Sequence, residues 1–547
     1  MQKIRLLIVP IILAIVTLSC GGSTKTTPEV VDPVAATVSA LEGEVNEPSQ
    51  VTESTVAPTE QVQQPLVEPT LAPMGYSRAN PYPGTEMVSV PNWDVQVLET
   101  KRGADAWSAI QAANAYNDPA PEGMEYLLVK IHVKCKYADS DEHGISNYDF
   151  DVTGEKSILY TSSMASIVKP SPELDAELFS DGETEGWAAY LVTQGESNLV
   201  LVFDEMWSFT DNAKRYIALD SGASIRVPSD LYNISASTLG KDRKSPVPSN
   251  EKLVTEDWET SIQEVVRGDS AWQLVQEANQ FNEPPDEGYE YIAVKFYVRY
   301  IGTNEESKNI DGSFYNITGS ANILHELPSV VDPEPALDIA LYPGGEYSGW
   351  VVFQSIIGET DLMFAFEETW NLFGDEVRYL ALDSDASIEV PTNLQDIAPS
   401  DIGKEINTPA SISDTVITED WEISVSQVVR GSEAWNMVIA ANQFNEPPED
   451  GYEYVAVKVI VHNTSTMDVA ENISGLNFKT TGSNGIFYDL PSIVDPEPAL
   501  DVTLYPDGEY EGWVILKVSV GETGLRLVYE PLFSLSNKNR RFIMLEP

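Results

Sequence analysis

Apolar and polar residues alternate strictly in several short stretches of this chain. In one stretch, the apolar side chains that share a face are Ile292, Val294, Phe296 and Val298. Residues 455–461 repeat the pattern, with valine at every second position. Because successive side chains of a strand point to opposite faces, this period of two predicts β-strands with one face on a core. We therefore expect strands at 292–298 and 455–461.

Further short apolar runs follow these strands and are separated by Gly, Pro, Asp and Asn. Examples from the middle of the chain are GWVVFQ, LMFAFE and RYLALD. Such a series is typical of an antiparallel β-sandwich of roughly seven or eight strands. One alanine-rich segment departs from the pattern. GADAWSAIQAANAY at 103–116, with counterparts at 268–281 and 431–444, predicts a short helix between the first two strands.

The chain contains three copies of one sequence pattern. FNEPPDEGYEYIAVK at 281–295 returns as FNEPPEDGYEYVAVK at 444–458, and a looser copy, YNDPAPEGMEYLLVK, lies at 116–130. The tryptophans that open the three copies are Trp93, Trp258 and Trp421. Their spacings of 165 and 163 residues are far longer than the repeat of a solenoid protein. Each copy is therefore expected to fold as a self-contained domain, with the copies joined like beads on a string.

The repeated stretch itself has a structural interpretation. Asn282 ends the predicted helix, Pro284 and Pro285 prevent its continuation, and Gly288 supplies a turn before the strand. The stretch therefore predicts a corner between helix and strand, and no chemistry is needed to explain why it recurs.

Composition divides the rest of the chain. The segment before Tyr76 is rich in Thr, Pro and Glu and has no aromatic residue after residue 20, so it cannot bury enough apolar surface to become ordered. The expected organisation is an all-β chain of three tandem antiparallel sandwiches, each with a short inserted helix. We expect a signal peptide at 1–19, a disordered stalk at 20–85, repeats at 86–228, 253–391 and 416–547, and linkers at 229–252 and 392–415.

The N-terminus carries the features of an export signal. Lys3 and Arg5 precede an apolar run from Leu6 to Leu18, which is shorter than the ~20 residues that a membrane-spanning helix needs. The following Ser-Cys-Gly resembles the lipobox of bacterial lipoproteins, although Thr17 stands where leucine is usual. This resemblance implies that Cys20 is lipidated and becomes the mature N-terminus. The alternative is an ordinary signal peptide. Either way, we expect an exported chain, and lipidation would anchor it to the bacterial cell membrane, facing the periplasm or the cell surface.

Two further motifs point to a family. LYPGGEYSGWVVF at 341–353 is echoed at 504–516 and 178–190, and VKVIVHN lies at 457–463 in the preceding strand. Together they resemble the DUF4352 family of bacterial envelope proteins. The resemblance implies an immunoglobulin-like β-sandwich for each of the three copies, and it brings no established catalytic residues with it.

The net charge of the chain limits the classes of partner that it could bind. The chain has 32 Lys and Arg against 86 Asp and Glu, a formal net charge of −54 at pH 7. Binding to nucleic acid or to an anionic lipid surface is therefore disfavoured, and membrane contact is expected only through the N-terminal lipid.

Apart from Cys20, the chain has one cysteine, Cys135, which continues the apolar face of its strand and should be buried and inert.

Acidic turns supply the candidate metal ligands. The sequence VDPEPALD occurs in the second and third copies and offers Asp332, Glu334, Asp338, Asp495, Glu497 and Asp501. Carboxylates at these spacings could converge on Ca²⁺. In the first copy, however, Lys169 and Ser171 take the first two places. Solvated turn carboxylates are the main interpretation, calcium is the alternative, and no other cofactor is expected.

Other recurring residues have structural and functional interpretations. All eleven tryptophans fall at recurring positions and either fill cores or present a flat sugar-binding face, and the exposure of Trp107, Trp272 and Trp435 would separate these alternatives. The four histidines do not align between copies, which argues against a repeated zinc or acid–base site. One arginine recurs before a glycine in every copy, as Arg102, Arg267 and Arg430. We expect it to pair with an acid of its own domain.

These observations favour a non-catalytic, lipid-anchored envelope protein that presents tandem immunoglobulin-like domains as a binding, adhesion or spacer module. Its ligand would be an unidentified protein or glycan of the envelope. The alternatives are a carbohydrate-binding protein, a calcium-stiffened surface adhesin and a hydrolase that uses paired carboxylates.

Overall fold

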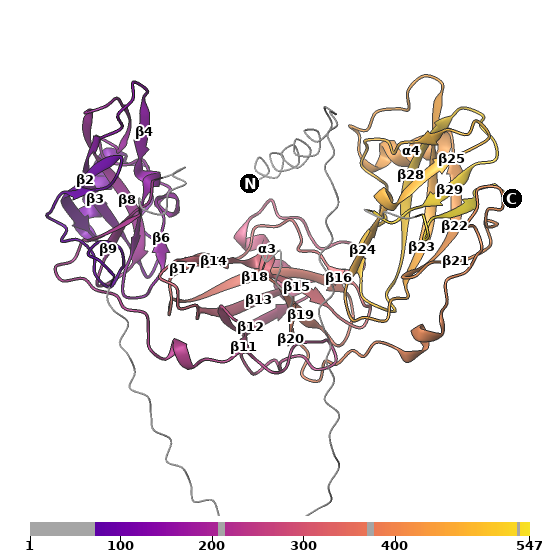
Figure 1. The fold of residues 1–547 in the computed structure, drawn as a ribbon, viewed down its shortest axis with the longest axis horizontal. Coiled ribbons are helices and arrows are strands. Elements are labelled where there is room, and N and C mark those ends of the chain that lie inside the picture. Colours follow the sequence, from indigo (N-terminus) through magenta and orange to yellow (C-terminus); the bar gives the residue numbers. More distant parts are fainter. Residues whose placement is uncertain (1–71, 206–213, 369–376, 533–536, 547) are drawn as a thin grey trace, which may run out of the picture. The chain divides into compact units, whose positions relative to one another are not determined.

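The computed structural model describes residues 72–205, 214–368, 377–532 and 537–546. The predicted signal peptide, Cys20 and most of the predicted stalk lie outside these residues. Within them, three similar groups of elements follow one another along the chain (Figure 1). None of the described helices is both long and apolar enough to cross a membrane.

In its described residues, the first repeat contains ten strands and one α-helix. Its elements are β1 (Val88–Ser89), β2 (Trp93–Arg102), α2 (Ala104–Ala113), β3 (Met124–Cys135), β4 (His143–Ser146), β5 (Phe150–Thr153), β6 (Leu159–Tyr160), β7 (Asp175–Leu178), β8 (Glu183–Thr193), β9 (Val200–Phe203) and β10 (Arg215–Ala218). They form two four-stranded sheets, β1-β2-β3-β8 and β10-β9-β5-β6, and the pair β4-β7. All of these strand pairings are antiparallel.

The second and third repeats have the same order of elements. The second contains β11 (Leu253–Val254), β12 (Trp258–Arg267), α3 (Asp269–Ala278), β13 (Tyr289–Tyr300), β14 (Lys308–Asp311), β15 (Tyr315–Thr318), β16 (Leu324–His325), β17 (Asp338–Leu341), β18 (Glu346–Ile356), β19 (Met363–Phe366) and β20 (Arg378–Ala381). The third contains β21 (Val416–Ile417), β22 (Trp421–Arg430), α4 (Ser432–Ala441), β23 (Tyr452–Asn463), β24 (Glu471–Ser474), β25 (Phe478–Thr481), β26 (Phe487–Tyr488), β27 (Asp501–Leu504), β28 (Glu509–Ser519), β29 (Arg526–Tyr529) and β30 (Arg541–Met544). Their sheets repeat the strand order of the first. The expected all-β architecture with one helix per repeat is confirmed.

Strand β13 shows why the alternating pattern forms this fold. Its apolar side chains Ile292, Val294, Phe296 and Val298 are fully buried in the main core, as the sequence predicted. The opposite face is covered in part by α3, where Ala271 and Val275 pack against Ala293 and Tyr291. The central sheet is therefore buried on one face by the second sheet and at one end of the other face by the helix, which explains the alanine at 293.

The corner between helix and strand has the predicted glycine turn, but the helix ends before Asn282, where its end was predicted, because Asn279 already adopts an extended backbone. Helix α3 begins after Gly268, which has a positive φ of 60°, a conformation that glycine adopts without steric cost. It ends at Ala278, and Gly288, with φ of 88°, precedes β13. The same geometry occurs at the corresponding glycines of the other two repeats.

The segments before each repeat differ from the sequence prediction. Tyr82 lies in the predicted stalk, yet its backbone N–H donates to the oxygen of Tyr216 at 2.8 Å, and its oxygen accepts from Ala218 at 2.8 Å. Val247 and Ala410, in the predicted linkers, bridge β20 and β30 in the same way. Glycine, proline and asparagine made these segments resemble linkers, but the free edge of a sheet supplies their backbone with hydrogen-bond partners. Each repeat therefore includes an N-terminal edge segment.

Candidate binding surface

Several of the calcium candidates accept hydrogen bonds from the protein backbone. Asp332 accepts a hydrogen bond from the N–H of Val352 at 2.8 Å, and Glu497 accepts one from Ala499 at 3.0 Å. Burial raises the pKa of Asp332 to about 6, and it does the same for Asp495. In the described part of the chain, no group of three or more His, Cys, Asp or Glu side chains is gathered for a metal ion. The structure therefore does not bring the six predicted carboxylates together.

These two buried carboxyls lead to a testable pH dependence. A raised folded-state pKa means that the charged form destabilises the fold above about pH 6, and that the penalty disappears as the pH falls towards the ordinary value. We expect the double variant Asp332→Asn/Asp495→Asn to be more stable than the parent at pH 7, by on the order of 1 kcal/mol per site, and equally stable near pH 4. Thermal melts across this range measure the effect.

The matched control removes two exposed charges from the same turns. Glu334→Gln/Glu497→Gln reduces the net charge equally, and because burial is the main cause of the raised pKa of Asp332 and Asp495, it should change the pH dependence of stability much less than the asparagine variant does. Equal pH profiles for the two double variants would contradict the assignment of the effect to Asp332 and Asp495.

Most of the described tryptophans belong to cores. The fully or nearly fully buried rings are Trp93, Trp187, Trp258, Trp350, Trp421 and Trp513. Trp107, Trp272 and Trp435 are half-buried beside the helix cluster, and Trp107 stacks on Tyr126 with ring centroids 6.0 Å apart. The core interpretation is therefore confirmed for the first six. Trp207 and Trp370, with the corresponding Phe533, lie outside the described residues.

His325, the most deeply buried histidine, contacts a buried glutamate. His325 Nε2 lies 2.8 Å from Glu359, and both side chains are buried. The equivalent glutamates of the other repeats accept instead from the hydroxyl groups of Tyr160 and Tyr488. In every repeat the same glutamate also accepts a backbone N–H from the β-turn opposite, for example that of Ala321 at 3.2 Å. In each repeat, this glutamate therefore joins its own turn to the turn opposite by hydrogen bonds.

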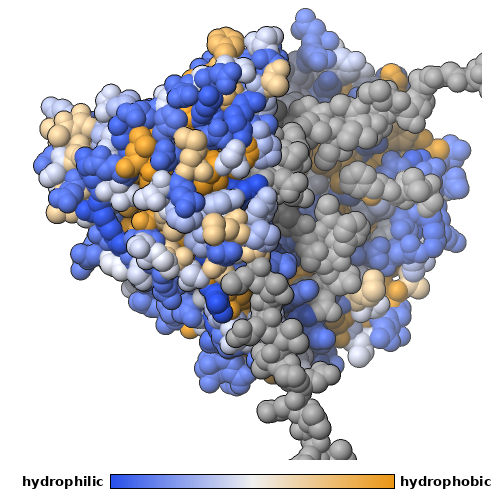
Figure 2. Space-filling model, turned by 60° about the vertical axis from the view of Figure 1, so that its left-hand side comes forward, coloured by the Kyte–Doolittle hydropathy of each residue, from blue (hydrophilic) through white to orange (hydrophobic). Residues whose placement is uncertain are grey.

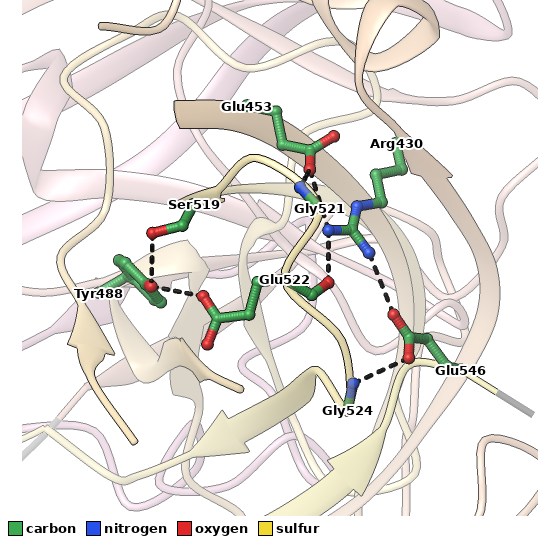
Figure 3. A network of polar contacts seen from close by, with 8 residues as sticks. All are labelled: Arg430, Glu453, Tyr488, Ser519, Gly521, Glu522, Gly524 and Glu546. Carbon is green, nitrogen blue, oxygen red and sulfur yellow. Dashed lines mark hydrogen bonds and ion pairs between the residues drawn. The ribbon is translucent and has the colours of Figure 1, made fainter. Parts of the chain in front are cut away.

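The recurring arginine anchors the turn that follows the long strand β28 (Figure 3). Arg430 pairs with Glu453 at 2.9 Å and with Glu546 at 3.0 Å. The two carboxylates in turn accept the N–H groups of Gly521 and Gly524 at 2.8 and 2.9 Å. In the other repeats, Arg102 and Arg267 pair with Glu125 and Glu290, both at 2.7 Å. The expected pairing within each domain is confirmed.

A hollow in the first repeat contains several acids. It has a volume of about 440 Å³, and Tyr137, His143, Asp149, Asp175 and Glu205 are among its lining residues. Glu205 accepts hydrogen bonds from Trp93 at 3.0 Å and from Tyr137 at 2.5 Å. Asp149 accepts the N–H of Ser146 at 2.8 Å. These two carboxylates therefore position loops of the first repeat.

One surface feature recurs in all three repeats and was not singled out by the sequence analysis. Tyr116, Phe281 and Phe444 occupy the same position after the helix, and they are 93%, 81% and 82% exposed. Large aromatic side chains usually bury most of their surface. A ring that remains in water adds almost nothing to the stability of the fold. Its presence at one position in every repeat therefore needs another explanation.

The exposed ring is held by a well-ordered loop. In the second repeat, Asn282 donates to the oxygens of Val275 and Val331 at 2.8 and 2.9 Å, and it accepts the N–H of Val331 at 2.9 Å. Asn279 also accepts the N–H of Phe281 at 3.0 Å. The first and third repeats have the same bonds through Asn117 and Asn445. These asparagines fix the loop, so the ring is presented from a defined backbone.

The same asparagine connects the ring to an exposed valine. The valines bonded in this way are Val168, Val331 and Val494, which are 53%, 50% and 50% exposed. We call each aromatic residue together with its valine a tip: Tyr116 with Val168, Phe281 with Val331, and Phe444 with Val494. The ring and the valine lie on two different loops that the asparagine joins, and both side chains are exposed, so each tip offers apolar groups for contact.

Acidic residues follow each aromatic ring in the sequence. In the second repeat these are Glu283, Asp286 and Glu287, and in the third they are Glu446, Glu449 and Asp450. The visible face of the molecule is mostly hydrophilic, with hydrophobic side chains in small separate groups (Figure 2). The tips are therefore apolar contacts on an acidic background.

The chain was compared with curated proteins and with solved structures. None of the curated proteins compared with this chain matches it. Among solved structures, a candidate lipoprotein from Bacillus subtilis subsp. subtilis strain 168, ycdA, is 15% identical over 24% of this chain and 38% of that chain, with a TM-score of 0.19. The yjhA protein of Bacillus subtilis is 16% identical over 25% of this chain and 99% of that one, with a TM-score of 0.18.

The family comparison gives the clearer result. DUF4352, a domain of unknown function, matches residues 86–214 and 410–540. These ranges cover most of the first and third repeats, and the second repeat, which lies between them, shares their strand order. We conclude that this chain carries two regions similar to DUF4352, at 86–214 and 410–540, with a third body of the same topology between them.

Proposed function

We propose that this chain is a non-catalytic protein of the bacterial envelope, anchored through a lipid on Cys20, whose immunoglobulin-like repeats form a multivalent binding module. The observation that carries the proposal is the exposure of one aromatic ring at the same position in every repeat. The leader and the lipobox-like cysteine support the location, and the DUF4352 matches support the non-catalytic character.

Three equal tips favour avidity over a single strong contact. One exposed ring with one valine offers too little area for tight binding by itself. When several such contacts engage one surface, the later ones become intramolecular, and avidity can exceed the single affinity by roughly 10²–10⁴. The partner that fits is a repeated envelope protein or glycan with apolar or sugar-ring surfaces for the tips, and with few negative charges of its own.

Co-sedimentation with isolated bacterial envelopes tests this proposal. The parent chain should sediment with envelope fragments, and the triple variant Tyr116→Ala/Phe281→Ala/Phe444→Ala should bind at least tenfold more weakly, with single variants in between. Digestion of the envelopes with a protease or with glycan hydrolases separates a protein partner from a glycan. Equal sedimentation of the parent and the triple variant would contradict the proposal.

A matched control alters exposed side chains that are not tips. Tyr148, Tyr232 and Leu476 are 57%, 57% and 64% exposed, and Tyr148 and Tyr232 have no aromatic counterpart in the other repeats. The triple alanine variant at these positions removes similar apolar area, and it should sediment with envelopes as the parent does.

The anchor is tested separately. Cells that express the parent and are fed a labelled fatty acid should incorporate the label into this chain, and the Cys20→Ala variant should lose the label completely, because no other group in the lipobox can accept the lipid. Label that persists in the variant would rule out Cys20 as the anchor.

A further inference from the structure

Consecutive repeats meet at a junction that is built in the same way twice. The described repeats belong to one compact unit. At the first junction, the guanidinium carbon of Arg78 lies 4.1 Å from the ring centroid of Tyr342, and Arg78 Nε lies 3.5 Å from Glu305. The N–H of Tyr342 donates to the oxygen of Ser157 at 2.8 Å. The edge segment and the β5–β6 turn of one repeat therefore enclose a tyrosine of the next.

The second junction repeats these contacts one domain later. Arg243 lies 3.9 Å from the ring centroid of Tyr505 and 2.7 Å from Asp468. The N–H of Tyr505 donates to the oxygen of Asn322 at 2.8 Å. Each residue occupies the position of its counterpart in the first junction, so the junction is a property of the repeat.

Backbone bridges close both junctions. Ile158 bridges Leu341, and Ile323 bridges Leu504, each in an antiparallel arrangement. The two isoleucines are 7% and 8% exposed, and Tyr342 and Tyr505 are 0% and 2% exposed. The isoleucine and the tyrosine at the centre of each junction are therefore buried.

Among the described residues, the first and third repeats each carry one set of these positions that no other repeat covers. Phe179 stands where Tyr342 and Tyr505 stand in the later repeats, and it is 60% exposed. We call Leu178 and Phe179 the leading face. At the other end, Ile406 takes the place of the junction arginine, and Ile486 and Phe487 take the places of the bridging turn residues. They are 36%, 50% and 49% exposed and form the trailing face.

The substitutions at the two ends match each other. At internal junctions a guanidinium covers a tyrosine beside an acid, whereas at the ends the corresponding residues are Ile406 and Phe179, both apolar. Exposed apolar side chains that gather at one surface mark interaction sites. Both ends keep them, with Ile406 in place of the junction arginine and Phe179 in place of the junction tyrosine.

We propose that a second copy of this chain docks at the ends, with the trailing face of one copy on the leading face of the next. Ile406 of one molecule would cover Phe179 of the other, and the turn at Ile486 would bridge Leu178 as Ile158 and Ile323 bridge their partners. The contact is heterologous, so it continues along a line of molecules instead of closing into a symmetric pair. This proposal uses surfaces other than the tips and stands independently of the proposed function.

The charge of the chain gives the association a characteristic salt dependence. Two copies with a net charge of −54 each repel one another, while the proposed contact itself is apolar. Salt screens the repulsion and leaves the apolar contact in place, so association should strengthen as ionic strength rises. An interaction driven by opposite charges would weaken under the same conditions.

Sedimentation velocity of the purified full chain tests the proposal. The parent should increase in mass with protein concentration, and more so at high salt. Phe179→Asp and Phe487→Asp should each remain monomeric to at least tenfold higher concentration, because each removes one face from every molecule. Tyr148→Asp, which places the same charge on an exposed aromatic position of the first repeat, should associate like the parent. Thermal melts confirm that the variants are folded.

Mixing the two end variants provides the decisive comparison. Phe179→Asp retains the trailing face and Phe487→Asp retains the leading face, so an equimolar mixture should form dimers and nothing larger. A parent that stays monomeric throughout, end variants that associate like the parent, or a mixture that forms no dimer would each overturn the proposal.

Discussion

Replacing Gly186 by alanine is expected to unfold the first repeat. A Cβ atom at this position would lie 2.4 Å from the backbone nitrogen and 2.5 Å from the Cα of Leu174. Leu174 is fully buried, and the clashing atoms belong to the backbone, so no side-chain rotation relieves the overlap. We expect a loss of about 3 kcal/mol or more in the free energy of unfolding, measured by denaturant titration of the chain.

Gly144 provides the control in the same repeat. It also lies in a strand, and a Cβ atom there would have no neighbour within 4 Å. Gly144→Ala should change the stability by less than about 0.5 kcal/mol. A Cβ atom on the corresponding Gly349 or Gly512 would lie 2.5 Å from the backbone of Leu337 or 2.7 Å from that of Leu500, so alanine at either position should unfold its own repeat. A stable Gly186→Ala variant would show that residues 172–174 do not pack against the backbone of β8 at Gly186.

Replacing Asn445 by alanine is expected to release the third tip. The side chain is 9% exposed, and it makes hydrogen bonds of 2.8 and 2.9 Å to the oxygens of Val438 and Val494 and of 2.9 Å from the N–H of Val494. Its removal leaves these backbone groups without their partner. We expect a loss of about 2–3 kcal/mol and faster hydrogen exchange at Val494.

Two further variants define the cause. Asn445→Asp keeps an acceptor for the N–H of Val494 but places a carboxylate against two carbonyl oxygens, so it should be at least as destabilising as alanine. Asn472, an exposed asparagine of the same repeat whose side-chain bonds are 3.2 Å or longer, should tolerate alanine with a loss of a few tenths of a kcal/mol. If Asn445→Ala and Asn472→Ala lost similar amounts of unfolding free energy, the hydrogen bonds of Asn445 would not be what holds the third tip.

Local patterns predicted the elements because their causes are local. The alternation of Ile292 to Val298 reflects one strand on one core, and the alanine-rich segment specifies a helix, although its end at Ala278 lies before the predicted one. The pairing of Arg430 with an acid of its own domain followed from the scarcity of positive charge. These features depend on neighbouring residues or on bulk composition, which a single sequence displays.

The tips and the edge segments depend on tertiary structure. An apolar residue is buried by default, so the sequence alone gave no reason to place Phe281 in water. The available indication was that an aromatic residue recurs directly after the helix end in all three copies. The contacts of Arg78 and Tyr82 could not be predicted from the sequence, because their partners, Tyr342 and Ile217, lie far along the chain.

The most direct test of the central claim is photo-crosslinking from the tips in living bacteria. Benzoylphenylalanine at 116, 281 or 444 replaces one exposed ring by another, and the account predicts an adduct to the same partner from all three positions, with none from position 148. No adduct from the tips, or the same adduct from position 148, would contradict a binding role for these rings.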